Sequence, residues 1–250
     1  NFPSKTIEAL SSIKDEDGKL AVLGALESGS FPKIVDAAKN FLQNLPSKNG
    51  LEEFMLRFSG ALFEIVATRS MEDVLGKRER IIPINEVFEV FAKTYPEREP
   101  ITNGFGLNLG IDGVRLPDGI IVHINGGAVY INAFCEYSLN PYSLQKKAWR
   151  YNSEKRKNGF VLDSHLTRRE ELKRNLAVFI RGRYPELPRR VQFDSQFGTI
   201  YVMPRESVFG NGHELAFGNG TRNRKFFVPL THRELRKIAG GIIEDLSLGL

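Results

Sequence analysis

Residues 113–151 read GVRLPDGIIVHINGGAVYINAFCEYSLNPYSLQKKAWRY, and this stretch predicts a strand, a tight turn, a second strand and a helix. The segment Asn125-Gly126-Gly127 indicates the turn, because a two-residue hairpin loop needs positive φ angles, which Asn and Gly tolerate. We expect the strands over 115–124 and 128–138. Asn140-Pro141 then predicts a helix start, with Asn as cap and Pro at the first helical position.

The two predicted strands carry one carboxylate each. The odd positions from 129 to 135 are apolar and predict a core face, while the other face presents Glu136, with Asn132 and Ser138 beside it. Asp118 precedes the β-branched run of the first strand. The hairpin should therefore bring Asp118 and Glu136 close together, although not directly opposite, and such a pair can bind Mg²⁺ or Mn²⁺ with water and phosphate.

A structural explanation of the two carboxylates is also open. Pro117-Asp118-Gly119 is a common turn sequence, in which Asp bonds to the backbone nearby. Glu136 equally fits an ion pair with a lysine of the helix that follows.

The arrangement of these residues resembles the PD-(D/E)XK nuclease superfamily. The resemblance is carried by Pro117-Asp118, the hairpin, Glu136-Tyr137-Ser138 and a helix that contains Gln145, Lys146 and Lys147. Ser138 stands where the lysine of the family would fall, so the resemblance implies that Lys146 or Lys147 takes that role from the helix. An upstream helix with Phe58 to Glu64 resembles the first core helix of the family, which makes Glu64 a candidate for a further metal ligand.

The resemblance implies an α/β (α+β) fold with a restriction-endonuclease-like mixed sheet flanked by helices. It implies a metal-dependent phosphodiesterase that acts on nucleic acid, with DNA as the expected substrate. Asp118 and Glu136 would hold Mg²⁺ (or Mn²⁺), Lys146 or Lys147 would orient water or stabilise developing charge, and Gln145 would position water or phosphate. The alternative is a catalytically inactive nuclease fold that binds nucleic acid or serves as an assembly subunit.

Helical periodicity predicts the rest of the organisation. We expect an N-terminal helical segment over 1–48, an α/β core over 49–200 and a C-terminal extension over 201–250 that ends in a helix. Long helices are predicted over 51–71 and 83–95, a basic helix over 167–183, and short separate strands over 191–193 and 199–203. The sequence Thr231-His-Arg-Glu234 is a capping box that should start the last helix.

Basic residues are concentrated in one part of the chain. Between residues 146 and 190, fourteen Lys or Arg stand against five acidic residues, which gives +9, while the rest of the chain carries −4 of a total of +5. Such segregation favours a surface that faces a polyanion, although a solvated basic face without a partner has the same composition. The predicted nucleic-acid contacts are Lys155, Arg156, Lys157, Arg168, Arg169, Lys173 and Arg174.

Several classes of protein are disfavoured by composition. The four histidines are scattered and there is a single cysteine, Cys135, so a structural zinc site is not expected and an internal disulfide is excluded. No Walker or Gly-x-Ser-x-Gly motif occurs. No apolar run reaches the length of a membrane span. We expect a cytoplasmic protein without a membrane partner, with a homodimer as one possible assembly. A helical protein-interaction module joined to an unrelated α+β domain is a third reading.

Overall fold

The computed structural model describes residues 4–44, 48–102, 109–111, 116–139, 168–205 and 224–249. Its elements, in chain order, are α1 (Ser4–Ser11), α2 (Glu16–Leu26), α3 (Phe31–Gln43), α4 (Lys48–Val74), β1 (Glu79–Pro83), α5 (Ile84–Thr94), β2 (Pro100–Thr102), β3 (Leu109–Ile111), β4 (Gly119–Asn125), β5 (Ala128–Tyr137), α8 (Arg169–Arg183), β6 (Arg190–Pro204), β7 (Arg224–Val228) and α9 (His232–Leu248).

Five strands form one mixed sheet in the order β1-β4-β5-β6-β7. Strands β1, β4 and β5 are joined as antiparallel neighbours, whereas β6 runs parallel to β5 and β7 parallel to β6. The short strands β2 and β3 form a separate antiparallel pair. The prediction of an α/β fold with a mixed sheet flanked by helices is therefore confirmed.

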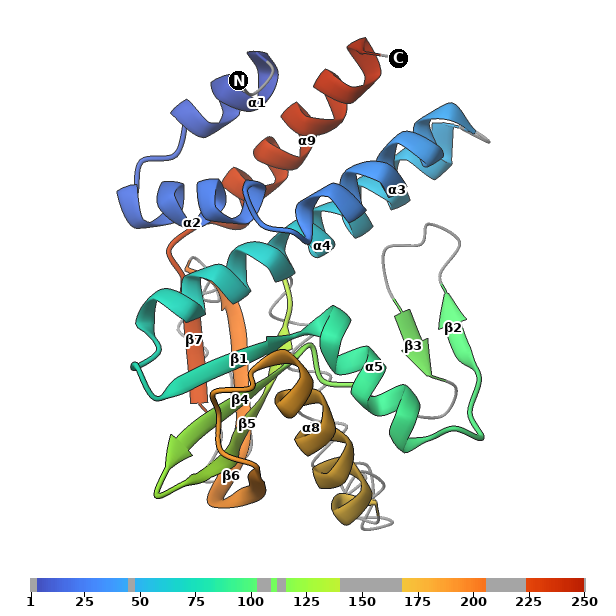
Figure 1. Cartoon of the computed structure of the whole chain (residues 1–250). Coiled ribbons are helices and arrows are strands. Elements are labelled where there is room, and N and C mark those ends of the chain that lie inside the picture. The colour runs from blue at the N-terminus through green and yellow to red at the C-terminus, as the bar shows by residue number, and fades with distance from the viewer. Residues whose placement is uncertain are drawn as a thin grey trace, which may run out of the picture.

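Helices cover both faces of this sheet and enclose two apolar cores. Figure 1 shows α1–α4 and α9 gathered at the top of the view, and α5 and α8 lower in the molecule beside the sheet. The first core, which we call the α4 core, joins α1–α4 and α9 to one face of the sheet. The second, which we call the α5–α8 core, joins α5 and α8 to the other face.

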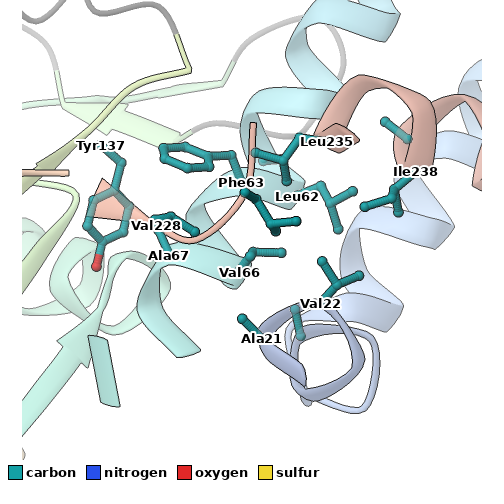
Figure 2. Packing of buried hydrophobic residues seen from close by; sticks show 14 of the residues in the cluster. Ala21, Val22, Leu62, Phe63, Val66, Ala67, Tyr137, Val228, Leu235 and Ile238 are labelled. Atoms are coloured by element: carbon teal, nitrogen blue, oxygen red, sulfur yellow. The ribbon is translucent and has the colours of Figure 1, made fainter. Parts of the chain in front are cut away.

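Helix α4 is the centre of the larger core. Its side chains Leu62, Phe63 and Val66 lie between α2 and α9 on one side and the sheet residues Tyr137 and Val228 on the other (Figure 2). Residues from the predicted N-terminal segment, from the predicted α/β core and from the C-terminal helix all belong to this one cluster. The predicted boundaries near 48 and 200 stay predictions, and the apolar packing runs across both.

The end of the chain also fixes its beginning. The carboxylate of Asp245 on α9 accepts hydrogen bonds from the backbone amides of Lys5 and Thr6, at 3.0 and 2.7 Å, and from the Thr6 hydroxyl at 2.7 Å. The first amides of a helix have no partner within that helix. Asp245 thus caps α1 from a distant part of the sequence.

The hairpin prediction is confirmed, with one correction to the second strand. Gly126 and Gly127 form the turn with φ of 54° and 76°. A bulge at Asn132 makes Ile121 pair with Ala133 while Val122 pairs with Ile131. A one-residue bulge changes which face the following side chains occupy. Val129 and Ile131 therefore face the α5–α8 core, whereas Ala133 and Cys135 face the α4 core, so the predicted single apolar face of β5 is wrong.

Other elements follow the sequence with corrections of detail. The helices predicted over 51–71, 83–95 and 167–183 are confirmed as α4, α5 and α8, and the capping box of α9 makes both of its hydrogen bonds. Residues 191–193 and 199–203 are strand as predicted, but both belong to the single strand β6, so the prediction of two separate strands is wrong. Sequence reasoning missed four short strands, β1, β2, β3 and β7, whose length gives little periodicity.

Candidate functional site

The two predicted metal ligands meet at the end of the β4–β5 pair. Gly119, the first residue of β4, pairs with Cys135, and Asp118 is the residue before that strand. The backbone amide of Asp118 also donates to the Cys135 carbonyl, so Asp118 departs from the register of the strands and does not stand directly opposite Glu136. The charges of both carboxylates act on the Cys135 thiol, so both lie near this residue.

Hydrogen bonds hold Asp118 against β5. Its backbone amide donates to the carbonyl of Cys135 at 2.8 Å, and its Oδ2 accepts from the backbone amide of Tyr137 at 2.6 Å. Asp118 is partly exposed, whereas the Glu136 side chain is only 2% exposed. The position of the Asp118 carboxylate is thus fixed relative to the peptide that follows Glu136.

The Cys135 thiol lies close to the carboxylates of Asp118 and Glu136. Complete burial raises its pKa, and the negative charges of Asp118 and Glu136 raise the pKa further. This agrees with the interpretation of Cys135 as a buried small side chain, because a thiol with a raised pKa is protonated at neutral pH and unreactive.

Glu64 approaches the pair from the other face of the sheet. It lies one turn before Thr68 on α4, and the Thr68 hydroxyl is 3.1 Å from the hydroxyl of Tyr137. Burial raises the pKa of Tyr137 well above its usual value, and the charges of nearby groups, including Asp118 and Glu64, raise it further. Among the described residues, no three His, Cys, Asp or Glu side chains gather tightly enough to form a ready metal site. The structure thus brings Asp118 and Glu136 together without adding Glu64 as a third ligand.

Two cavities meet at Glu64. The first has a volume of about 720 Å³ and lies between the α2–α3 turn, α4 and the start of α5, with Glu27, Lys33 and Arg69 among its lining residues. The second has a volume of about 600 Å³ and lies between α4, the end of β5 and the start of α9. Glu64 lines both cavities, and Tyr137 and Ser138 line the second. Glu64 therefore lies in the wall between the two cavities.

Several predicted functional residues lie outside the part of the chain that the structure describes. These are Gln145, Lys146, Lys147, Lys155, Arg156 and Lys157. Their proposed roles stay predictions.

The basic residues of α8 have different surroundings. The guanidinium of Arg168 binds both carboxylate oxygens of Glu97 at 2.8 and 3.0 Å, donates to the carbonyl of Thr94 at 2.8 Å and lies 4.9 Å from the ring centre of Tyr95. Arg168 therefore joins the start of α8 to the end of α5, and its role in nucleic-acid binding stays a prediction.

The other predicted contacts of α8 differ from Arg168. Lys173 forms an ion pair with Glu170 at 2.5 Å, with its side chain 22% exposed. Arg174 is exposed and has no ion-pair partner in the described part of the chain. The Arg169 side chain lies outside the part of the chain that the structure describes. Among Arg168, Lys173 and Arg174, the charge of Arg174 is the most available to an anion in solution.

Sequence reasoning missed three side chains that line the second cavity. They are Ser59 on α4 and His232 and Arg236 on α9. The spacing of His232 and Arg236 by four residues on a predicted helix was a signal that they share a face. Their position beside Glu64 depends on the packing of α9 against α4, which no local pattern specifies.

Comparison with known proteins identifies no relative. No family model matches the chain, and neither the curated proteins nor the solved structures include a significant match. The described residues contain no helix that is long and apolar enough to cross a membrane.

Proposed function

We propose that this protein is a metal-dependent phosphodiesterase that cleaves nucleic acid, with DNA as its expected substrate. The observation that carries the proposal is that Asp118 bonds to the backbone on both sides of Glu136: its amide donates to the Cys135 carbonyl and its carboxylate accepts from the Tyr137 amide. The mixed sheet flanked by helices is compatible with the PD-(D/E)XK nuclease resemblance.

The donor set fits Mg²⁺ or Mn²⁺. Both cations prefer carboxylate oxygens and take the rest of their ligands from water and phosphate, so two protein carboxylates are sufficient. A carboxylate has two oxygens, and acceptance of one amide hydrogen bond leaves Asp118 compatible with coordination. Asp118 and Glu136 would hold the ion, and Glu64 would be the next carboxylate toward the substrate. When bound, such an ion lowers the pKa of a coordinated water and neutralises charge on a phosphate.

The chain itself would supply orientation and charge. The Tyr137 amide holds Asp118 in place, and the pairing of β4 with β5 holds Glu136. Lys146 or Lys147 would stabilise negative charge that develops on the phosphate, and Gln145 would position it. Basic residues of 155–174, with Arg174 exposed, would contact the backbone of the nucleic acid and give salt-dependent affinity. The proposal extends to a cytoplasmic location, to which a single cysteine is suited, and to a possible homodimer.

The experiment compares Glu136→Gln with Glu79→Gln. Glu79 belongs to the same sheet but pairs with His123, near the other end of β4, so its substitution is a matched control. The full chain and both variants are incubated with single- and double-stranded DNA and with RNA, in Mg²⁺, Mn²⁺ or EDTA. We expect metal-dependent cleavage by the wild type and by Glu79→Gln, and its loss in Glu136→Gln.

A specific departure from the family pattern favours a second candidate function. Ser138 stands at the position of the family's lysine, and a hydroxyl cannot supply a positive charge. A wild-type chain that binds nucleic acid but never cleaves it, with either metal, would overturn the enzymatic proposal. The protein would then be a nucleic-acid-binding or assembly subunit with a nuclease-like sheet.

A further inference from the structure

The second cavity has the size of a ligand site and lies next to the proposed metal ligands. Its volume of about 600 Å³ is within the range of small-molecule pockets, which is roughly 300–1,000 Å³. Its lining combines α4, the residues Tyr137, Ser138 and Leu139 after Glu136, and the start of α9. The cavity therefore lies at the same end of β5 as Glu136, on the α4 side of the sheet.

Gly60 keeps one wall of this cavity open. It lies within the 27-residue helix α4, where glycine is less favourable than alanine because its backbone loses more conformational freedom. A Cβ atom at Gly60 would have no atom of another packed residue within 4 Å. Packing of the described residues therefore does not explain the glycine, whereas an incoming group would occupy the space beside it.

Ser59 lines the cavity with an unsatisfied hydroxyl. The residue is 2% exposed, and its Oγ has no hydrogen-bond partner. Buried polar atoms in proteins are almost always hydrogen-bonded, because burial without a partner costs free energy. A ligand acceptor that reached the buried Ser59 hydroxyl would satisfy it.

Arg236 supplies positive charge at the opposite wall, with His232 beside it. They are one helical turn apart on α9 and both line the cavity. Burial lowers the pKa of His232, and the nearby charge of Arg236 lowers the pKa further, which places the two groups close together. Arg236 makes no hydrogen bond or ion pair in the described part of the chain. Its guanidinium, with planar donors that match phosphate oxygens, is available for an anion.

We propose that this cavity binds a phosphate of the nucleic-acid strand, adjacent to the phosphate held at Asp118 and Glu136. Arg236 is the charged donor, and His232 and Ser59 are the neutral donors. The inference rests on the proposed function, because a phosphodiester strand is the anion that would connect the two sites. Free phosphate presents the same oxygens, so the test must separate a strand phosphate from a free one.

The main test measures binding without divalent metal, so that cleavage cannot interfere. Affinity for a fluorescent oligonucleotide is measured over a salt titration for the wild type, Arg236→Gln and Arg233→Gln. Arg233 is exposed on the same helix and does not line the cavity, so it controls for net charge. We expect Arg236→Gln to weaken binding about 10-fold or more and to reduce the salt slope by about one, because a charge-assisted contact is lost. Arg233→Gln should change binding much less.

Two further measurements locate the phosphate. Replacement of single phosphates by uncharged methylphosphonate should reveal one position that weakens wild-type binding and has no additional effect in Arg236→Gln. Gly60→Leu should fill the cavity and weaken binding with the melting temperature retained. Competition by inorganic phosphate tests whether the cavity binds free phosphate. If millimolar phosphate displaces the oligonucleotide from the wild type, and no methylphosphonate position weakens binding, the proposal of a strand-phosphate site would be overturned.

The outcomes separate this inference from the proposed function. Equal binding by Arg236→Gln and Arg233→Gln, with metal-dependent cleavage intact in the wild type, would overturn the phosphate site alone. Selective weakening in Arg236→Gln, in a protein that never cleaves, would support the phosphate site and overturn the nuclease. Absence of any nucleic-acid binding by the wild type would overturn both.

Discussion

The Oδ2 atom of Asp118 accepts a 2.6 Å hydrogen bond from the backbone amide of Tyr137, which directly follows Glu136. This contact ties the residue before β4 to the last residue of β5. It gives Asp118 a structural role and a proposed metal-binding role at once, and the two roles can be separated because they depend on different properties of the carboxylate.

Asp118→Asn tests this separation. The carbonyl oxygen of Asn can still accept from the Tyr137 amide, so we expect the melting temperature to stay within a few degrees of wild type. Loss of the negative charge should reduce metal-dependent cleavage about 100-fold or more, since even outer partners of a metal site contribute about 10- to 100-fold. Thermal melts and cleavage rates measure the two effects. Full cleavage by Asp118→Asn would exclude Asp118 as a ligand.

Arg168 and Arg174 should respond differently to substitution, although both belong to the basic segment. Arg168→Ala removes a bidentate ion pair and a backbone contact, all partly exposed, so we expect a loss of about 1–2 kcal/mol in the free energy of unfolding. Arg174→Ala should leave stability unchanged and weaken nucleic-acid binding. Denaturant titration and oligonucleotide binding check the pair, and equal stability of both variants would contradict the structural role of Arg168.

Adjacent glycines of α9 provide a matched pair for the packing of the chain ends. A Cβ at Gly241 would lie 2.7 Å from the backbone carbonyl oxygen of Lys5, whereas a Cβ at Gly240 meets nothing within 4 Å. Gly241→Ala should cost about 1–3 kcal/mol through overpacking. Gly240→Ala should gain about 0.5–1 kcal/mol through better helix propensity. Denaturant titration of both variants gives the comparison, and a neutral Gly241→Ala would show that α1 does not dock closely on α9.

Asp245 should make the docking of α1 sensitive to acid. Burial alone would raise the pKa of this carboxyl, but hydrogen bonds from Thr6 and Lys5 outweigh it and hold the pKa below its usual value. A lowered pKa in the folded state means that the stabilisation is present above the unfolded pKa of about 4 and is lost as pH falls through the folded value.

The measurement for Asp245 is a pH series of unfolding. Wild type should exceed Asp245→Asn in stability near neutral pH, by about 1–2 kcal/mol, and the difference should shrink as pH falls below about 4. Glu244→Gln, which changes the exposed neighbour, should show no such narrowing. A difference between wild type and Asp245→Asn that stays constant down to acid pH would rule out the carboxylate as the source.

Local sequence predicted much of the secondary structure, because short-range rules govern it. The positive φ of Gly126 and Gly127 follows from the turn that the hairpin needs, and the capping box of α9 follows from Thr231 and Glu234. The apolar residues of α4 lie on several sides of the helix, as expected for a helix that packs against several other elements.

The bulge at Asn132 and the short strand β1 were not predictable in the same way. A single Asn within a predicted strand does not specify a bulge, and the five residues of β1 are too few to show a period. The bulge nevertheless decides which face of the sheet Glu136 occupies, and the residues around it in the sequence did not predict this.

By itself, the sequence determined the hairpin, the helices and the assignment of one acidic residue to each hairpin strand, since turn geometry and helical periodicity act over a few neighbours. Only the tertiary structure decided that Asp118 bonds to the backbone on both sides of Glu136, and that Arg236, a hundred residues further along the chain than Glu136, lines a cavity with Glu64. Strand register and helix docking are set by the burial of apolar surface between distant segments, and that free energy is a property of the packed whole.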